Sequence, residues 1–500
     1  MKRYLLALDQ GTTSSRCIVF DCKGKEMARA GREFRQYFPA EGFVEHDAEE
    51  IFESQLAVTR EAIARAAIDP TEIVALGITN QRETVVVWDK TTGKPIHPAI
   101  VWQCRRTESE CRRLNKAGLA PMIREKTGLP IDPYFSATKL AYILDHVPDA
   151  RARARRGELL FGTVDTWLIY KLTNGTVHVT DPSNAARTML FNIHTLSWDR
   201  ELLRLFDIPE AMLPRVLPSV GIFGKTSPEL LGASITIASA AGDQQAALFG
   251  QCCFGEGDAK NTYGTGGFLL MNTGEKPIRS KNGLLTTVGW QIGQKTAYVL
   301  EGSVFICGAA IQWLRDGLGL LASAKESEEL AASVEHCGGV QFLPSFVGLG
   351  TPHWDPTVRG AVFGITRGTT RAHLVRAALE AMALQTADVL SVMQEDTGLT
   401  LPSLRVDGGA AANDLLLTMQ SDFTGLSIIR PASVETTARG AAMMAGLAAG
   451  IFADLDEITS LSAVDRSFFP TLSDSARKKR LADWHAAIDA AIAYSRAITL

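Results

Sequence analysis

Two short segments with the same chemistry, far apart in the chain, most constrain the fold. Residues 4–21 hold two apolar runs rich in strand-forming residues around a Gly/Thr/Ser turn, and residues 261–271 repeat this pattern around the glycines of 264–267. Such a pattern predicts a β-hairpin. Two similar hairpins roughly 250 residues apart indicate a duplicated architecture rather than a short-period repeat.

The length of the chain agrees with a duplication. Its 500 residues exceed what a single hydrophobic core usually organises. We therefore expect an N-terminal domain of residues 1–252 and a C-terminal domain of residues 253–500. No linker-like or low-complexity segment marks this boundary, so we expect an extensive interface between the domains, with a cleft.

Helix and strand signals alternate along both halves. Asp47 with Glu50 predicts a capping box that begins a helix, and the apolar residues of 73–78 and 234–241 predict buried strands. A longer helix is predicted over about 371–395. This mixture predicts an α/β protein rather than an all-α or all-β one.

Composition excludes several classes of function. The net charge of −4, with 46% hydrophobic and 21% charged residues, predicts a soluble protein without the basic surface that nucleic acid or an anionic membrane requires. The apolar segments 4–8 and 441–453 are too short for a signal peptide and a membrane span, respectively. Eight cysteines without a CxxC pair, and nine histidines without a cluster, favour reduced thiols, no zinc site and a cytoplasmic location.

The turn of the first hairpin has the chemistry of a phosphate site. The backbone N–H groups of residues 11–13 can form an anion-binding nest, and the hydroxyls of Thr12, Thr13 and Ser14 add donors. Asp9 could hold Mg²⁺, and Arg16 could offset charge on a transferred phosphoryl group. Taken alone, the turn is more typical of an ordinary hairpin than of a phosphate site, because Asp/Gly/Thr turns are common.

The second hairpin and a later loop extend this interpretation. The turn around Thr265 could grip phosphates from the opposite domain, and Gly409 with Asn413 could line an adenosine pocket. The chain has neither a Walker A sequence nor the glycine-rich loop and HRD element of protein kinases. A nucleotide site here must therefore be built from the two hairpins.

Seven segments give the chain a specific resemblance. They are residues 8–16, 80–84, 101–107, 134–139, 241–245, 263–268 and 370–386. The chain resembles the FGGY family of carbohydrate kinases nearly end to end, and the Arg82–Glu83 pair is similar to the branch that acts on glycerol. The resemblance implies two ribonuclease-H-like domains of the actin/hexokinase type that close over ATP and substrate.

The resemblance also implies roles for individual residues. The polyol would be bound by Arg82, Glu83, Trp102, Tyr134, Asp243, Gln244 and Phe268. The nucleotide would be bound by Thr12, Thr13, Ser14, Arg16, Thr265, Gly308, Gln312, Gly409 and Asn413. The catalytic residues would be Asp243 as base, Arg16, and Asp9 with its Mg²⁺.

Physical chemistry agrees with these roles. A triol presents donors and acceptors, which an adjacent Arg–Glu pair can match, while aromatic rings cover its CH groups. A carboxylate is roughly 10 orders of magnitude less basic than an alkoxide, so removing the hydroxyl proton before attack would cost on the order of 14 kcal/mol. Asp243 would therefore orient the hydroxyl and accept its proton late.

Two alternatives remain open from the sequence. A pentulose kinase of the same family would share the hairpins, although the Arg82–Glu83 pair favours glycerol. A non-catalytic, actin-like nucleotide switch would be expected to lack the base, but Asp243 is present. We expect ATP and glycerol as the partners, with no nucleic acid and no membrane span, and a homo-oligomer (a dimer or a tetramer).

Overall fold

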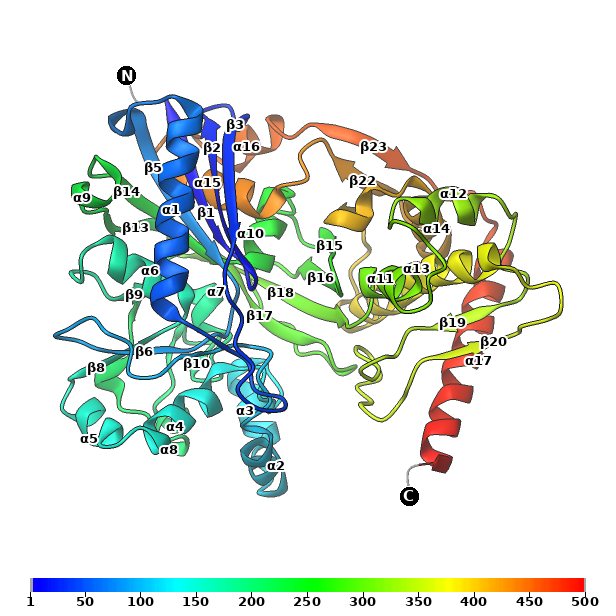
Figure 1. Ribbon diagram of the computed structural model, residues 1–500, viewed down its shortest axis with the longest axis horizontal. Coiled ribbons are helices and arrows are strands. Elements are labelled where there is room, and N and C mark those ends of the chain that lie inside the picture. The colour runs from blue at the N-terminus through cyan, green and yellow to red at the C-terminus, as the bar shows by residue number, and fades with distance from the viewer. Residues whose placement is uncertain (1–2, 499–500) are drawn as a thin grey trace.

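In the computed structural model, which describes residues 3–498, one mixed sheet of 13 strands runs through the centre of the molecule (Figure 1). The strand order is β23-β22-β21-β15-β16-β18-β17-β13-β14-β5-β1-β2-β3. The strands of the N-terminal half are β1 (Tyr4–Gln10), β2 (Ser14–Asp21), β3 (Glu26–Glu33), β5 (Ile73–Asn80), β13 (Val220–Lys225) and β14 (Thr236–Gly242). Those of the C-terminal half are β15 (Ala259–Tyr263), β16 (Gly267–Asn272), β17 (Leu285–Ile292), β18 (Lys295–Val304), β21 (Leu404–Asp407), β22 (Ile428–Pro431) and β23 (Val464–Phe468).

The two halves of the sheet share one topology. In the order β3-β2-β1-β5-β14, the hairpin strands β3, β2 and β1 are antiparallel, and β5 and β14 continue parallel to β1. In the order β18-β16-β15-β21-β22 the same directions recur. The predicted α/β class, the two hairpins and the duplication are therefore confirmed.

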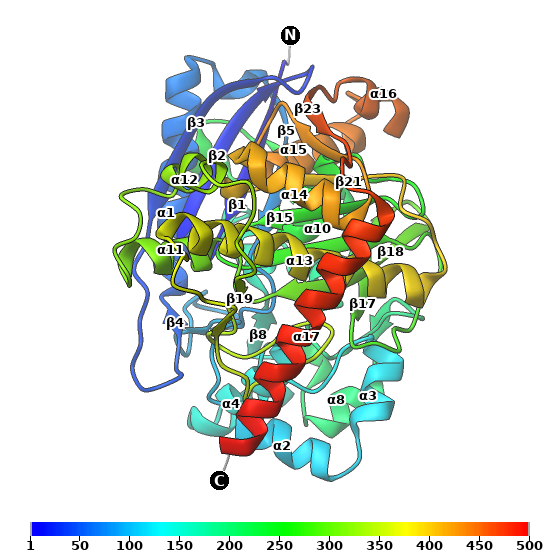
Figure 2. The same cartoon turned by 90° about the vertical axis from the view of Figure 1, so that its right-hand side faces the viewer.

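Helices cover both faces of this sheet (Figures 1 and 2). They include α1 (Ala48–Ala66), α6 (Val164–Leu172), α10 (Asp243–Gly250), α11 (Gly308–Asp316), α12 (Glu326–Ala332), α13 (Arg371–Thr397), α14 (Asp414–Thr424), α15 (Thr436–Ala448) and α17 (Asp474–Ile498). The predicted helix over 371–395 is confirmed as α13, and Figure 2 shows α17 along the outer face of the C-terminal half. None of the helices described is both long and apolar enough to cross a membrane.

The capping box predicted for Asp47 and Glu50 does not form, so this local prediction is wrong. The side chain of Asp47 caps α1 by accepting the backbone N–H groups of Glu49 and Glu50. The Glu50 carboxylate does not complete a capping box, because it accepts the backbone N–H of Arg35 at 3.0 Å instead. This contact ties the start of α1 to the segment that follows β3.

The segment between β5 and β13 builds a subdomain with its own core, at the lower left of Figure 1. It contains α2 (Glu108–Lys116), α3 (Ala120–Thr127), α4 (Ser136–His146), α5 (Ala150–Arg155), α7 (Pro182–Ala185), α8 (Arg200–Leu205) and the paired strands β6 (Val86–Asp89) and β8 (Leu159–Gly162). Tyr134 lies just before α4, and Arg187 just after α7. The subdomain therefore delivers both side chains to the edge of the main sheet.

Helices α10 and α15 cross at glycines, so their backbones touch. A Cβ atom on Gly440 would lie 1.9 Å from the carbonyl oxygen of Ala246, and one on Gly250 would lie 2.0 Å from that of Thr436. A Cβ on Gly77 of β5 would lie 2.1 Å from the carbonyl oxygen of Ala441. Only glycine allows this approach, which fixes α10, and Asp243 at its start, against β5 and α15.

We predict that Gly440→Ala lowers the thermal unfolding midpoint, because its new methyl group overlaps backbone that cannot rotate away. Overpacking of this kind costs about 1–3 kcal/mol or more. The matched control is Gly368→Ala, in a turn where the closest atom to a new Cβ is the Thr366 hydroxyl at 3.8 Å. Equal midpoints for the two variants would contradict the packing described for α10 and α15.

Candidate functional site

The candidate residues of the N-terminal half gather at one edge of the sheet. In the parallel strands β1, β5 and β14, Gln10 and Gly242 both lie opposite Asn80. The chain continues from these positions to Arg82 after β5 and to Asp243 after β14, while Asp9 lies at the end of β1. Side chains that are far apart in sequence therefore meet where three parallel strands end, the usual position of a ligand site in an α/β sheet.

The guanidinium of Arg82 is the centre of this cluster. It donates to both carboxylate oxygens of Glu301, with Nη1 at 2.5 Å from Oε2 and Nη2 at 3.1 Å from Oε1. Its Nε lies 3.4 Å from Oδ1 of Asp243. The side chains of Arg82 and Glu301 are 2% and 0% exposed, whereas that of Asp243 is 32% exposed. Asp243 is thus the member of the cluster that solvent reaches.

Arg187 and Glu83 complete a buried network of four charges. Arg187 donates from Nε to Glu83 at 2.6 Å and from Nη2 to Glu301 at 3.0 Å. Glu83 adopts a φ of 62°, a left-handed conformation that is costly for a residue with a side chain and is typical of functional sites. The network holds two cations and two anions, so its internal charge is balanced.

Sequence reasoning missed Glu301 and Arg187. Glu301 interrupts the apolar residues of β18, and an unexplained charge within a buried strand is a signal that could have found it. Arg187 follows a short helix, with nothing in the adjacent sequence to distinguish it. It is recognisable only once the subdomain is folded.

The charges of the network shift the pKa values of its own two carboxylates. Burial alone would raise the pKa of Glu301, but Arg187 and Arg82 outweigh burial and lower that pKa to about 2. Burial raises the pKa of Glu83, against the opposing effect of both arginines. Glu301 therefore stays ionised and is the carboxylate on which the two guanidinium groups depend most.

An aromatic pair connects this network to the first hairpin. The hydroxyl of Tyr134 accepts a long hydrogen bond from Nη2 of Arg82 at 3.5 Å, and the rings of Tyr134 and Trp102 meet edge to face at 5.4 Å. Trp102 donates from Nε1 to the Thr12 hydroxyl at 2.9 Å. Phe268 lies half-buried on β16, opposite Thr262 in the ladder.

Asp9 and Arg16 form an ion pair at the base of the hairpin turn, with Nη2 of Arg16 at 2.7 Å from Oδ2 of Asp9. Glu435, just before α15, accepts from Arg16 at 3.2 Å and from Arg29 at 2.8 Å. Burial raises the pKa of Asp9 to about 6, Arg16 opposes this rise, and the charges of Asp243 and Glu435 add to it. Glu435, which sequence reasoning did not single out, thus links the C-terminal half to the first hairpin.

The remaining nucleotide candidates lie around the second hairpin. The carbonyl of Thr265 accepts the backbone N–H groups of Cys307 and Ala309, and Gly308 donates its N–H to the carbonyl of Gly264 at 3.0 Å. The turn therefore rests on the N-terminus of α11, from which Gln312 points to solvent.

The glycine loop after β21 packs beside this hairpin. Gly408, with a φ of 85°, lies so close to Tyr263 that a Cβ would meet the Tyr263 carbonyl oxygen at 2.3 Å. Gly409 is exposed, and Asn413 caps α14 by accepting the backbone N–H of Leu416 at 2.8 Å. The loop is thus positioned beside the second hairpin, with Gly409 open to solvent.

A magnesium ion fits the donors present, although the protein would supply few of its ligands. Oδ2 of Asp9 is buried beside Nη2 of Arg16, at 2.7 Å, so a metal ion bound there would share this carboxylate with Arg16. Within residues 3–498, no three His, Cys, Asp or Glu side chains are grouped so that they could hold a metal alone. Mg²⁺ characteristically binds one or two carboxylates and keeps waters and substrate phosphates as its other ligands, which suits this arrangement.

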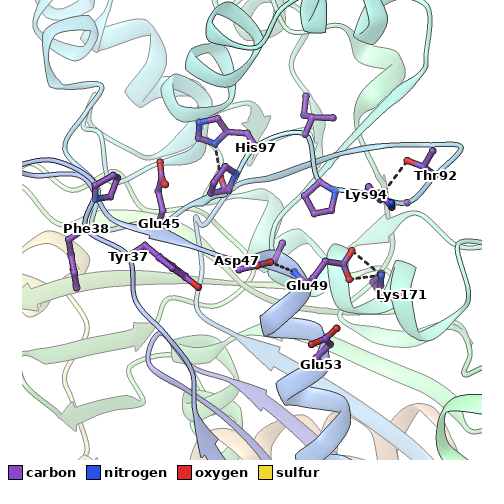
Figure 3. Close-up of a pocket in the computed structure, with 16 residues that line it drawn as sticks. Tyr37, Phe38, Glu45, Asp47, Glu49, Glu53, Thr92, Lys94, His97 and Lys171 are labelled. Carbon is purple, nitrogen blue, oxygen red and sulfur yellow. Dashed lines mark hydrogen bonds and ion pairs between the residues drawn. The ribbon is translucent and has the colours of Figure 1, made fainter.

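A large surface cavity of about 1090 Å³ lies away from these residues, between the start of α1 and residues 92–98 (Figure 3). Several of its polar groups have partners within the protein: Lys171 pairs with Glu49 at 2.8 Å, Asp47 caps α1, and His97 bonds to the Pro98 carbonyl. It contains none of the residues predicted to bind a ligand. Its size therefore does not make it the functional site.

Comparisons with known proteins agree along the whole chain. Family models described as "FGGY family of carbohydrate kinases" match residues 4–250 with the N-terminal domain and residues 259–449 with the C-terminal domain. The chain is 56% identical to "Glycerol kinase 2" of Thermotoga maritima, over 99% of this chain and 100% of that protein. The structure of Plasmodium falciparum glycerol kinase with ADP superimposes with a TM-score of 0.93 at 35% identity, covering 98% of each chain. A xylulose kinase of Lactobacillus acidophilus, with a TM-score of 0.86, 22% identity and coverage of 99% and 98%, shares the fold.

We predict that Glu301→Gln destabilises the protein, because Arg82 and Arg187 lose their shared partner inside the core. Breaking a buried ion pair in this way costs about 3–5 kcal/mol, measurable by chemical unfolding at pH 7. Glu275→Gln, at an exposed position, is the control and should leave the free energy of unfolding unchanged.

The loss of stability expected in Glu301→Gln should depend on pH. The pKa of Glu301 is lowered to about 2 from its usual 4.5, so its contribution to stability is complete above pH 4.5 and disappears as the pH falls towards 2. The stability difference between Glu301→Gln and wild type should shrink over that interval. A difference that grows on acidification would contradict the assigned network.

Proposed function

The chain belongs to the FGGY family of carbohydrate kinases, and we propose that it transfers the γ-phosphoryl group of ATP to glycerol, giving sn-glycerol 3-phosphate and ADP. The observation that carries this proposal is the position of Asp243, 3.4 Å from the buried guanidinium of Arg82, at the sheet edge where the phosphate hairpin ends. A hydroxyl held by Arg82 would lie within reach of this carboxylate.

The polyol end of the site has the polarity that glycerol requires. Arg82 supplies donors, and Glu83 and Asp243 supply acceptors, while the Tyr134 hydroxyl can do either. Trp102 and Phe268 would cover the CH groups of the substrate. Because the polar groups are held by the network before substrate arrives, little ordering remains to be done on binding.

Asp243 orients the attacking hydroxyl and accepts its proton as the new bond forms. The loose transition state of phosphoryl transfer requires little bonding from the attacking oxygen, so a weak base suffices. Positioning two reactants can account for about 7–11 kcal/mol of a barrier, which is the larger contribution here. The buried network therefore acts in catalysis mainly by fixing where Asp243 and the substrate hydroxyl meet.

The first hairpin holds the phosphates. The backbone N–H groups of its turn, the hydroxyls of Thr12, Thr13 and Ser14, and the guanidinium of Arg16 would face the phosphate oxygens, and a phosphate can take the place of Glu435 beside Arg16. Thr265, Gly308, Gln312, Gly409 and Asn413 would bind the rest of the nucleotide. When bound to Asp9, Mg²⁺ would neutralise charge on the phosphates.

The glycerol assignment is favoured over a pentulose. The glycerol kinase of Thermotoga maritima matches at 56% identity over its full length, whereas the likeness to xylulose kinase, at 22%, extends only to the fold. A non-catalytic switch is disfavoured because Asp243 remains partly open to solvent beside Arg82. We further propose a cytoplasmic location and a homo-oligomeric assembly.

We predict that wild-type protein consumes ATP with glycerol far faster than with xylulose or ribulose, and that Asp243→Asn lowers turnover at least about 100-fold, as expected for loss of a general base. The measurement is coupled ADP release at saturating ATP and Mg²⁺. Nucleotide affinity, from calorimetry with ADP, should stay close to that of wild type, because Asp243 does not hold the adenosine.

The control is Asp483→Asn, at an exposed position on α17, which should keep full turnover. Retention by Asp243→Asn of more than a tenth of wild-type turnover would rule out the base. A preference of the wild type for a pentulose would overturn the proposed substrate.

A further inference from the structure

A lysine that none of these roles uses lies fully buried beside the site. Lys260 is the second residue of β15, and its side chain has no exposed surface. Its Nζ donates to Oε1 of Gln244 at 2.5 Å and to the Thr262 hydroxyl at 2.7 Å. It therefore reaches from a strand of the C-terminal half to the first turn of α10, next to Asp243.

The contact with Lys260 determines how the Gln244 amide is turned. An ammonium group only donates hydrogen bonds, so the carbonyl oxygen of the amide, and not its NH₂ group, must face Lys260. The NH₂ group of Gln244 then points away from Lys260. Because Gln244 is only partly buried and directly follows Asp243, its two N–H donors are available to a ligand at the sheet edge.

The burial of the Lys260 ammonium is energetically costly, which indicates a functional reason for its position. None of the ion pairs among residues 3–498 includes this ammonium, whose hydrogen-bond acceptors are an amide and a hydroxyl. Burying a charge without a counter-charge at ion-pair distance destabilises the folded protein by on the order of several kcal/mol. The charged groups that act on it are Asp407, Asp243, Arg82 and Glu301, which belong to the site and its supporting strands.

We propose that Lys260 is a positioning residue for the polyol: its ammonium holds the Gln244 amide so that the NH₂ group donates to a substrate hydroxyl oxygen. This inference rests on the proposed function, because it names a specificity contact within that same site. Lys260 itself does not touch the substrate. Lys260 acts indirectly, because it determines which polar group of the Gln244 amide faces the substrate.

The contact depends on the charge of the lysine. Burial lowers the pKa of Lys260 to about 8, while Asp407 and Asp243 oppose this effect. Below that pH the ammonium only donates, and the amide is fixed. Above it the neutral amine can also accept, so Gln244 can turn its carbonyl oxygen towards the substrate. The KM for glycerol should therefore rise as the pH increases from 7 to 9.

The test compares glycerol and ATP kinetics of wild type and Lys260→Met between pH 6.5 and 9.5. Removal of a charged donor predicts a glycerol KM at least about 10-fold higher at pH 7, a KM for ATP within about twofold of wild type, and loss of the rise in KM above pH 8. Lys116→Met, at an exposed position on α2, should behave as wild type throughout.

The pH profile separates Lys260 from a second buried lysine. Burial also lowers the pKa of Lys139 to about 8, and Lys139 donates to the carbonyls of Pro133 and Tyr134. A pH-dependent rise that persists in Lys260→Met therefore belongs to another group, and the proposal fails. Unchanged glycerol KM in this variant at pH 7 also overturns it.

A second variant keeps the proposal testable if Lys260→Met does not fold. Gln244→Glu can pair with Lys260 but has no N–H donor to offer, so it should raise the glycerol KM at least about 10-fold. It should also abolish the rise in KM between pH 7 and 9, because no amide is left to turn. An unchanged KM would show that the Gln244 donors are not used. Absence of glycerol turnover in the wild type would instead refute the proposed function.

Discussion

The guanidinium of Arg82 is held by both oxygens of Glu301 in a position with almost no exposed surface, and the other polar residues of the site are arranged around this contact. Glu301 also holds Arg187, which in turn holds Glu83. Two cations and two anions thus neutralise one another, and the cost of burying them is offset only because their geometry is good and their hydrogen bonds are shared. Asp243 remains at the open side of the network, next to Arg82.

The fold explains how these residues come together. The ends of β1, β5 and β14 supply Asp9, Arg82 and Asp243, the subdomain supplies Arg187, and β18 of the other half supplies Glu301. Glycine contacts between α10 and α15 fix the helix on which Asp243 lies. Both halves of the duplicated sheet therefore contribute to one charge cluster, and Lys260 and Glu435 add further contacts between them.

Local chemistry in the sequence was enough to predict the hairpins, the buried strands, α13 and the duplicated α/β architecture, because turn glycines and apolar runs specify these elements directly. The family resemblance was needed to single out residues such as Trp102 and Phe268, which are otherwise indistinguishable from core side chains. Glu301 and Arg187 were missed because their significance lies in ion pairs between residues more than 100 positions apart in the chain. Lys260 was missed because its contact with Gln244 joins two different structural elements. The predicted capping box at Glu50 was wrong because a tertiary contact with Arg35 replaced the local one.

We propose that Arg82 positions the polyol through its forked guanidinium and not through charge alone. The most direct measurement is the KM for glycerol and for ATP in Arg82→Lys, a change that keeps the positive charge beside Glu301 but loses the bidentate contact and the Nε next to Asp243. We predict a glycerol KM at least about 10-fold above that of wild type, with the KM for ATP within about twofold. Equal changes in both constants, or no change in either, would contradict the account.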